Sequence, residues 1–183
     1  MVRHVFSKVG MTSIFRDSGE AQGVTLLQIK QSKVLRHEAV EGGRPVVVVS
    51  YDKGTRKELV HGWLVGDAAA FPVGESLPLP ALEAGQLVKV TGYSKGRGFQ
   101  DAMTRHGFAG GPGSHGSRFH RNPGSVGMRT EPGRTPKGKR LPGQDGNVKV
   151  SVRNLQVAFW SPEEGLLAVH GGVPGARGSC VLV

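Results

Sequence analysis

The residues with the clearest chemistry are lysines and arginines separated by glycines, beginning at position 92. The run Gly92-Tyr-Ser-Lys-Gly-Arg-Gly-Phe99 alternates small residues with Lys95 and Arg97. Glycine lets the backbone approach a ligand closely, so exposed backbone amides can donate hydrogen bonds beside the two cationic side chains. Such a set of donors suits the oxygens of a phosphate group. The run therefore predicts a phosphate-binding segment.

Further cations continue to position 140, and aromatic residues lie among them. Arginine offers a planar fork for phosphate and a flat face for stacking on a base. Phe99, Phe108 and Phe119 are interleaved with these cations, and aromatic rings stack on unpaired RNA bases. The alternative is a solvated basic loop without a fixed partner, which regular Phe and Met residues disfavour. The predicted RNA-contacting residues are Lys95, Arg97, Phe99, Arg105, His115, Arg118, Phe119, His120, Arg121, Arg134, Lys137, Lys139 and Arg140.

Two other motifs in this region predict no further chemistry. Residues 133–139 match the GxxxxGK pattern of nucleotide-binding loops, but Arg140 replaces the hydroxyl residue that would bind magnesium, and Pro136 interrupts the pattern. The histidines at 106, 115 and 120 have no cysteines or clustered carboxylates nearby, so we expect no metal site and no cofactor. Asp101 and Asp145 are expected to pair with local arginines rather than to act as a catalytic acid and base. We therefore expect no enzymatic activity.

The positive charge of the chain is concentrated in this same region. The formal net charge of the 183 residues is +10, and residues 92–146 hold ten Lys and Arg against three Asp and Glu. Those 55 residues also hold 14 of the 29 glycines and 5 of the 11 prolines. A glycine-rich, charged segment of this length cannot bury enough apolar surface to order itself in water. It needs an anionic surface to lie on, and it should be protease-sensitive in the isolated protein.

The flanking residues are nearly neutral and read as short strands. Segments 12–15 and 24–29, joined by a turn at 17–20, predict a hairpin, and segments 46–49 and 86–91 predict further strands. Segments 148–152, 157–160, 166–169 and 180–183 predict four more. Residues 67–70 could start a helix, which Pro72 would keep short. Short strands at this spacing favour a mainly β fold with a small β-barrel, formed by residues 1–91 and 147–183, with residues 92–146 inserted as a long, largely irregular basic loop.

A membrane is a poor candidate for the anionic partner. We find no amphipathic basic helix and no run of 18 apolar residues, so no segment is expected to span a bilayer or lie on it. The first ten residues lack the apolar stretch of a signal peptide. The single cysteine, Cys180, excludes an internal disulfide and reads as a small core residue. A cytoplasmic, reducing location is expected.

Several segments, in the same order along the chain, resemble the universal large-subunit ribosomal protein L-three family. The longest are Lys8-Val-Gly-Met-Thr-Ser-Ile-Phe15, Thr91-Gly-Tyr-Ser-Lys-Gly-Arg-Gly-Phe-Gln100 and His120-Arg-Asn-Pro-Gly-Ser-Val-Gly127. Shorter ones are Arg105-His-Gly-Phe108, Ser114-His-Gly-Ser117, Pro132-Gly-Arg134, Lys137-Gly-Lys139, Pro142-Gly143, Val152-Arg-Asn-Leu155 and Gly172-Val-Pro-Gly-Ala176. The resemblance covers nearly the whole chain and is weakest over 36–84.

The resemblance implies a split six-stranded barrel of the translation-protein type and a structural role in the large ribosomal subunit. The protein would bind large-subunit ribosomal RNA directly and support early subunit assembly, next to other large-subunit proteins and not as a homo-oligomer. The basic loop would reach toward the peptidyl transferase centre, with its tip at Met128, Arg129, Thr130 and Glu131. A bacterial cytoplasmic ribosome is favoured, with an organellar one as the alternative.

The chain also departs from the family pattern. It is shorter across 54–84, and Thr130 stands where many bacterial members carry a methylated glutamine, so we expect no such methylation. Residues 141–145 replace a segment that is richer in methionine. Two rival functions stay open from the sequence: an RNA-modifying or nucleotide-using enzyme with an RNA-binding barrel, and a free RNA chaperone.

Overall fold

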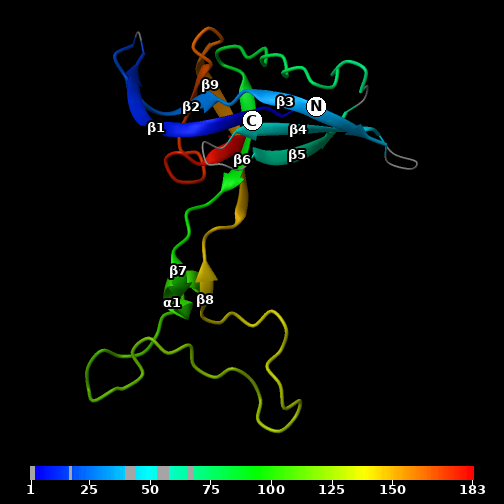
Figure 1. Cartoon of the computed structure of the whole chain (residues 1–183). Coiled ribbons are helices and arrows are strands. Elements are labelled where there is room, and N and C mark those ends of the chain that lie inside the picture. Colours follow the sequence, from blue (N-terminus) through cyan, green and yellow to red (C-terminus); the bar gives the residue numbers. More distant parts are fainter. Residues whose placement is uncertain (1–2, 17, 40–43, 53–57, 66–67) are drawn as a thin grey trace. The chain divides into compact units, whose positions relative to one another are not determined.

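The computed structural model describes residues 3–16, 18–39, 44–52, 58–65 and 68–183, and Figure 1 shows its elements. The fold is mainly β, as the sequence predicts, and its one described helix has five residues. By internal contacts the chain divides into two compact units: Met1–Ser94 with Lys149–Val183, and Lys95–Val148. We call the first the body and the second the loop unit.

Six strands of the body hydrogen-bond into a closed ring. The order around the ring is β1-β11-β6-β9-β10-β2, and β2 pairs back onto β1. All six pairings are antiparallel. The strands are β1 (Val5–Phe15), β2 (Ala21–Ile29), β6 (Leu87–Tyr93), β9 (Lys149–Ser161), β10 (Leu166–His170) and β11 (Cys180–Leu182).

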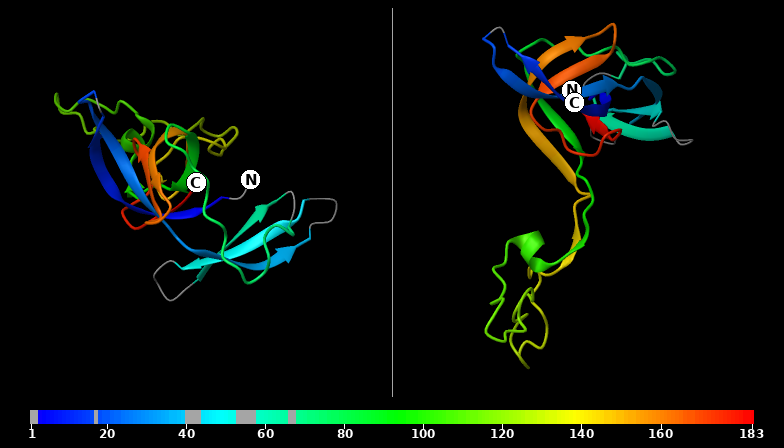
Figure 2. Two further views of the ribbon diagram at one scale, coloured as in Figure 1. Left: turned by 90° about the horizontal axis from the view of Figure 1, so that it is seen from above. Right: turned by 90° about the vertical axis from the view of Figure 1, so that its left-hand side faces the viewer.

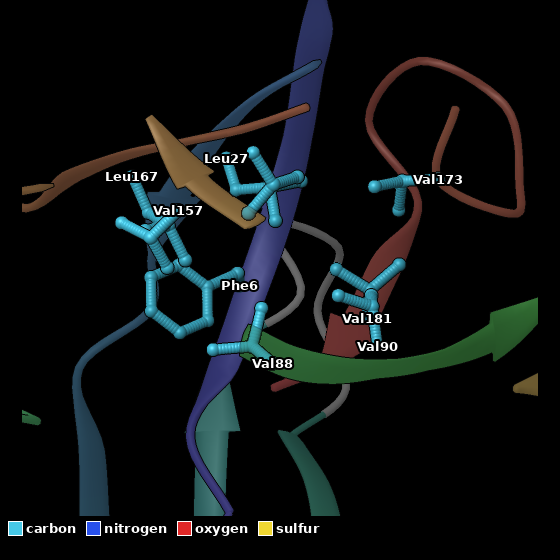
Figure 3. Close-up of a cluster of buried hydrophobic side chains, with 9 residues drawn as sticks. Phe6, Leu27, Val88, Val90, Val157, Leu167, Val173 and Val181 are labelled. Atoms are coloured by element: carbon cyan, nitrogen blue, oxygen red, sulfur yellow. The ribbon is translucent and has the colours of Figure 1, made fainter. Parts of the chain in front are cut away.

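Side chains that point into the ring form the larger core of the body. Phe6 is fully buried and contacts Trp160 edge-on, with ring centroids 6.0 Å apart. Figure 3 shows it among aliphatic side chains that come from every other strand of the ring and from the loop before β11. The buried members of this cluster are Phe6, Leu27, Val88, Val90, Val157, Leu167, Val169, Val173 and Val181. Fully burying one such side chain stabilises a fold by about 1.5–3 kcal/mol.

A second sheet packs on the outside of the ring. It contains β3 (Ser32–Glu38), β4 (Val46–Asp52) and β5 (Glu58–Leu64), in that order, and both views in Figure 2 show it in cyan beside the ring. Its core includes Val5 of β1 and Leu182 of β11 together with Val34, Val47, Val49, Tyr51, Trp63 and Val65. Successive residues of a strand point to opposite faces. Val5 therefore packs outward on this sheet while Phe6 packs inward.

The strands predicted from the sequence are confirmed, with one correction to their bounds and one to a possible helix. Segments 148–152 and 157–160 belong to one strand, β9, in which Asn154 adopts a left-handed conformation (φ 59°) where the register with β6 shifts. The helix that residues 67–70 could have started is absent over the described residues 68–71, which form a bend and a turn. Asp67, and Asp17 of the predicted hairpin turn, lie outside the described residues.

Cys180 is half-buried and packs against the second cluster. Cys180 is therefore a small residue at the margin of that core, whereas the sequence predicted a small residue within a core.

Candidate nucleic-acid interface

The loop unit has almost no hydrophobic core of its own. Of its 54 residues, all of them described, only Ala102 is buried. Phe99 and Met128 are 70% and 80% exposed. The unit contains thirteen glycines and many charged residues, which leaves too few apolar side chains to form a core. The structure of the unit must therefore be stabilised by local hydrogen bonds and ion pairs.

A short ribbon begins and ends the loop unit. Strand β7 (Gly98–Gln100) pairs with β8 (Gly143–Asp145), so that Gly98 lies opposite Asp145. The Arg97 guanidinium lies 3.3 Å from a carboxylate oxygen of Asp145, and the Arg97 N–H donates to the Asp145 carbonyl at 2.9 Å. The expected pairing of Asp145 with a local arginine is confirmed.

Helix α1 (Ala102–His106) follows the ribbon and is capped at both ends; Figure 1 shows it beside β7 and β8. Asp101 accepts a hydrogen bond from the Thr104 N–H at 2.9 Å, the usual role of aspartate before a helix. Gly107 ends the helix in the left-handed conformation (φ 72°).

Arg121 binds this helix start from twenty residues further along the chain. Its guanidinium donates to the second carboxylate oxygen of Asp101 and, at 3.2 Å, to the Thr104 hydroxyl. One side chain thus ties residue 121 to the first turn of α1, which confirms the expected pairing of Asp101 with a local arginine.

The last turn of α1 binds a third part of the loop. The Arg105 guanidinium donates to the carbonyl oxygen of Leu141 at 3.0 Å, and His106 Nε2 lies 3.2 Å from the same oxygen. The helix is therefore connected to residues 121 and 141, although neither is near it in sequence.

Close backbone approaches complete this region. The Gly111 N–H donates to the His120 carbonyl at 3.0 Å, and a side chain on Gly111 would overlap the Phe119 backbone. We call residues 95–111, 119–121 and 141–148 the base of the loop unit. Residues 112–118 and 122–140 are its distal segments.

The Asp101 carboxyl group has a pKa below its ordinary value. Hydrogen bonds from the Thr104 side chain and N–H, followed by the Arg121 guanidinium, lower this pKa. A carboxyl group whose pKa is lower in the folded state than in the unfolded state stabilises the folded state. This stabilisation is fully present above the unfolded pKa of about 3.9. It is lost as pH falls through the lower, folded-state pKa.

We therefore expect the base to keep its structure on acidification to about pH 4 and to loosen below the lowered Asp101 pKa. An NMR titration of the Thr104 amide measures this, because that amide donates to Asp101. An Asp101→Asn variant, which keeps a capping oxygen but cannot titrate, is the control. A Thr104 shift centred at the ordinary aspartate pKa would contradict the expectation.

The ten cationic side chains of the loop unit fall into two groups. All ten are exposed, but Arg97, Arg105 and Arg121 are engaged in the base as described above. The side chains of the other seven have no ion pair or hydrogen bond with any part of the chain that the structure describes: Lys95, Arg118, Arg129, Arg134, Lys137, Lys139 and Arg140. Six of these seven lie in the distal segments.

The other predicted site residues are spread over both parts of the unit. Phe99 is exposed on β7, and Phe119 and His120 lie exposed in the base. His115 is exposed in a distal segment and has a positive φ of 57°. The tip residues 128–131 are all exposed. The base thus holds seven of the predicted site residues, and the others lie in the distal segments; the seven are Lys95, Arg97, Phe99, Arg105, Phe119, His120 and Arg121.

Several residues that order the base were not predicted as site residues. His106, Gln100 and Thr104 each make hydrogen bonds there. Only the cap left a visible signal, because aspartate is a preferred residue immediately before the first residue of a helix.

The two remaining motifs gain no support from the geometry. Residues 133–139 contain neither strand nor helix, so the strand–loop–helix setting of a nucleotide-binding loop is absent there. Among the described residues, no three His, Cys, Asp or Glu side chains are grouped so that they could hold a metal ion. No helix in the described part of the chain is long and apolar enough to span a membrane.

Comparison with known proteins identifies clear relatives. The family model described as ribosomal protein L3 matches residues 79–161. Large ribosomal subunit protein uL3 of Thermotoga petrophila is 40% identical over 96% of this chain and 93% of the relative, and that of Syntrophus aciditrophicus is 36% identical over 96% and 89%. The protein of the same name from Thermosipho melanesiensis is 50% identical over 80% of this chain and 72% of the relative.

Proposed function

From the premise that this chain belongs to the ribosomal protein L3 family, we propose that its loop unit binds large-subunit ribosomal RNA directly. Membership of this family makes the chain a structural constituent of the large ribosomal subunit, and the family is a structural, non-enzymatic one. Its partners are accordingly ribosomal RNA and other ribosomal proteins. The relatives compared above are bacterial, which favours a bacterial, cytoplasmic ribosome.

One observation carries the RNA-binding proposal: seven exposed cations lie on a unit that has neither a core nor acidic partners for them. The loop unit holds ten cations and three acids, and two of the acids are paired within the base. Unpaired arginine and lysine side chains on an open backbone bind phosphate groups with little reorganisation. Phe99, which is also exposed, offers a stacking surface for an unpaired base.

The body would hold the protein in place while the loop unit enters the RNA. The closed six-stranded ring fits the translation-protein type of barrel that the family resemblance implies. The exposed residues Met128, Arg129, Thr130 and Glu131 form the part of the loop that reaches toward the peptidyl transferase centre. Ordering such a loop costs about 1–2 kcal/mol per residue, so RNA contacts that form as the subunit assembles must offset that cost.

Sedimentation of the tagged chain from a cell lysate at moderate salt tests this proposal. We expect the protein to sediment with large subunits and whole ribosomes, because its contacts are buried among RNA helices. A matched variant in which the six distal cations are replaced by glutamine should shift toward the top of the gradient. A wild-type chain found free, or bound only to small RNAs, would instead indicate a chaperone and contradict the proposal.

A further inference from the structure

We propose that the base of the loop unit is assembled before RNA binds, and that Arg97, Arg105 and Arg121 are positioning residues rather than phosphate contacts. The distal cations, with Lys95, then make the phosphate contacts. This inference rests on the proposed RNA-binding function and divides its cationic residues into two classes.

The first argument is the reach of the contacts in the base. Arg121 joins Asp101 across twenty residues, Arg105 joins Leu141 across thirty-six, and Arg97 joins Asp145 across forty-eight. Together with the β7–β8 ribbon and the capped helix α1, these contacts link the two ends of the loop to its middle. Such links fix a closed shape without a hydrophobic core.

The distal segments lack contacts of this kind. The hydrogen bonds within residues 122–140 join Ser125 to Gly127 and Lys139 to Pro136, so each spans two or three residues. In residues 112–118, the Ser117 N–H donates to the Ser114 carbonyl three residues earlier. Turns of this length do not restrain the path of the chain as a whole, and RNA is the surface that would set it.

Charge divides in the same way. The distal segments hold six cations and one acid, Glu131, whereas the base holds four cations and both paired acids. A phosphate that took Arg121 away from Asp101 would come to lie next to a carboxylate. Like charges repel at that distance. Arg121 is therefore better placed to hold helix α1 than to bind RNA.

The first experiment measures RNA affinity as a function of salt for matched single variants of the full chain. Each phosphate contact contributes about 0.7–0.9 to the slope of log affinity against log salt concentration. We expect Arg134→Gln to reduce the slope by that amount. Arg121→Gln should leave the slope unchanged while affinity falls by at most about fivefold, the effect of losing one exposed ion pair at the start of helix α1. If Arg121→Gln reduced the slope as Arg134→Gln does, the inference would be wrong.

The second experiment is limited trypsin digestion of the free protein, and it needs no RNA. We expect cleavage after Arg118, Arg129, Arg134, Lys139 and Arg140, and resistance after Arg97 and Arg105, because a protease requires locally unfolded chain. Asp101→Ala should open the Arg105 site, whereas Glu131→Ala, the matched acid with no ion-pair partner among the described residues, should not. Early wild-type cleavage at Arg97 and Arg105 would overturn the preassembled base. If the chain did not bind RNA at all, the proposed function would fail, while digestion would still decide whether the base forms.

Discussion

Replacing Arg134, Lys137, Lys139 and Arg140 with glutamine is expected to weaken binding to large-subunit ribosomal RNA by about three orders of magnitude at about 0.1 M monovalent salt. The four side chains are exposed and have no ion pair or hydrogen bond within the described chain. Each is therefore available for one phosphate. Four contacts at about 0.7–0.9 each should lower the salt slope by about 3.

A charge-preserving variant separates this effect from disturbance of the loop. Exchanging lysine and arginine at the same four positions keeps all four charges and should keep the slope. Filter binding or fluorescence anisotropy with a large-subunit RNA transcript, over a range of salt concentrations, measures both variants. Equal slopes for the glutamine variant and the wild type would show that these residues do not contact phosphate.

The second large effect is expected in the body, from Phe6→Ala. Phe6 is 0% exposed and packs in the ring core against Trp160. Removing a buried phenylalanine side chain costs about 3–5 kcal/mol, because the apolar contacts are lost and a cavity is left. Urea unfolding followed by tryptophan fluorescence should show a much lower midpoint for this variant.

Phe15→Ala is the matched control, because Phe15 lies on the same strand but is 75% exposed. Its unfolding free energy should change by no more than about 0.5 kcal/mol. If the two variants had the same midpoint, the ring core described here would not be the main source of stability of the body.

The start of β9 could be predicted from a period of two, since Val148, Val150 and Val152 alternate with polar residues, and β9 covers all of these except Val148. Burial is not the source of that period, because Val148 and Val150 are 56% and 36% exposed. The continuation of β9 to Ser161 could not be predicted from this alternation, because Asn154 interrupts the period without ending the strand. A left-handed asparagine at a register shift has no periodic signature.

The base of the loop unit could be predicted only in part. That Asp101 and Asp145 would pair with local arginines followed from the excess of cations around them. Which arginine each would choose did not, because Arg121 is twenty residues from Asp101 and the intervening glycines leave the path of the chain open. The sequence also could not predict that Arg105 binds the carbonyl oxygen of Leu141, because every residue carries a backbone carbonyl.

The position of β11 in the ring has a consequence for the order of events during synthesis. Strand β11 lies between β1 and β6, so Val5 pairs with Leu182 across nearly the whole length of the chain. Until residue 182 has left the exit tunnel, one side of β1 has no neighbour and the ring stays open. Pairings between such distant residues form slowly, since the intervening chain must first be brought together. The loop unit, which is translated earlier, is thus available to RNA before the body that carries it can close.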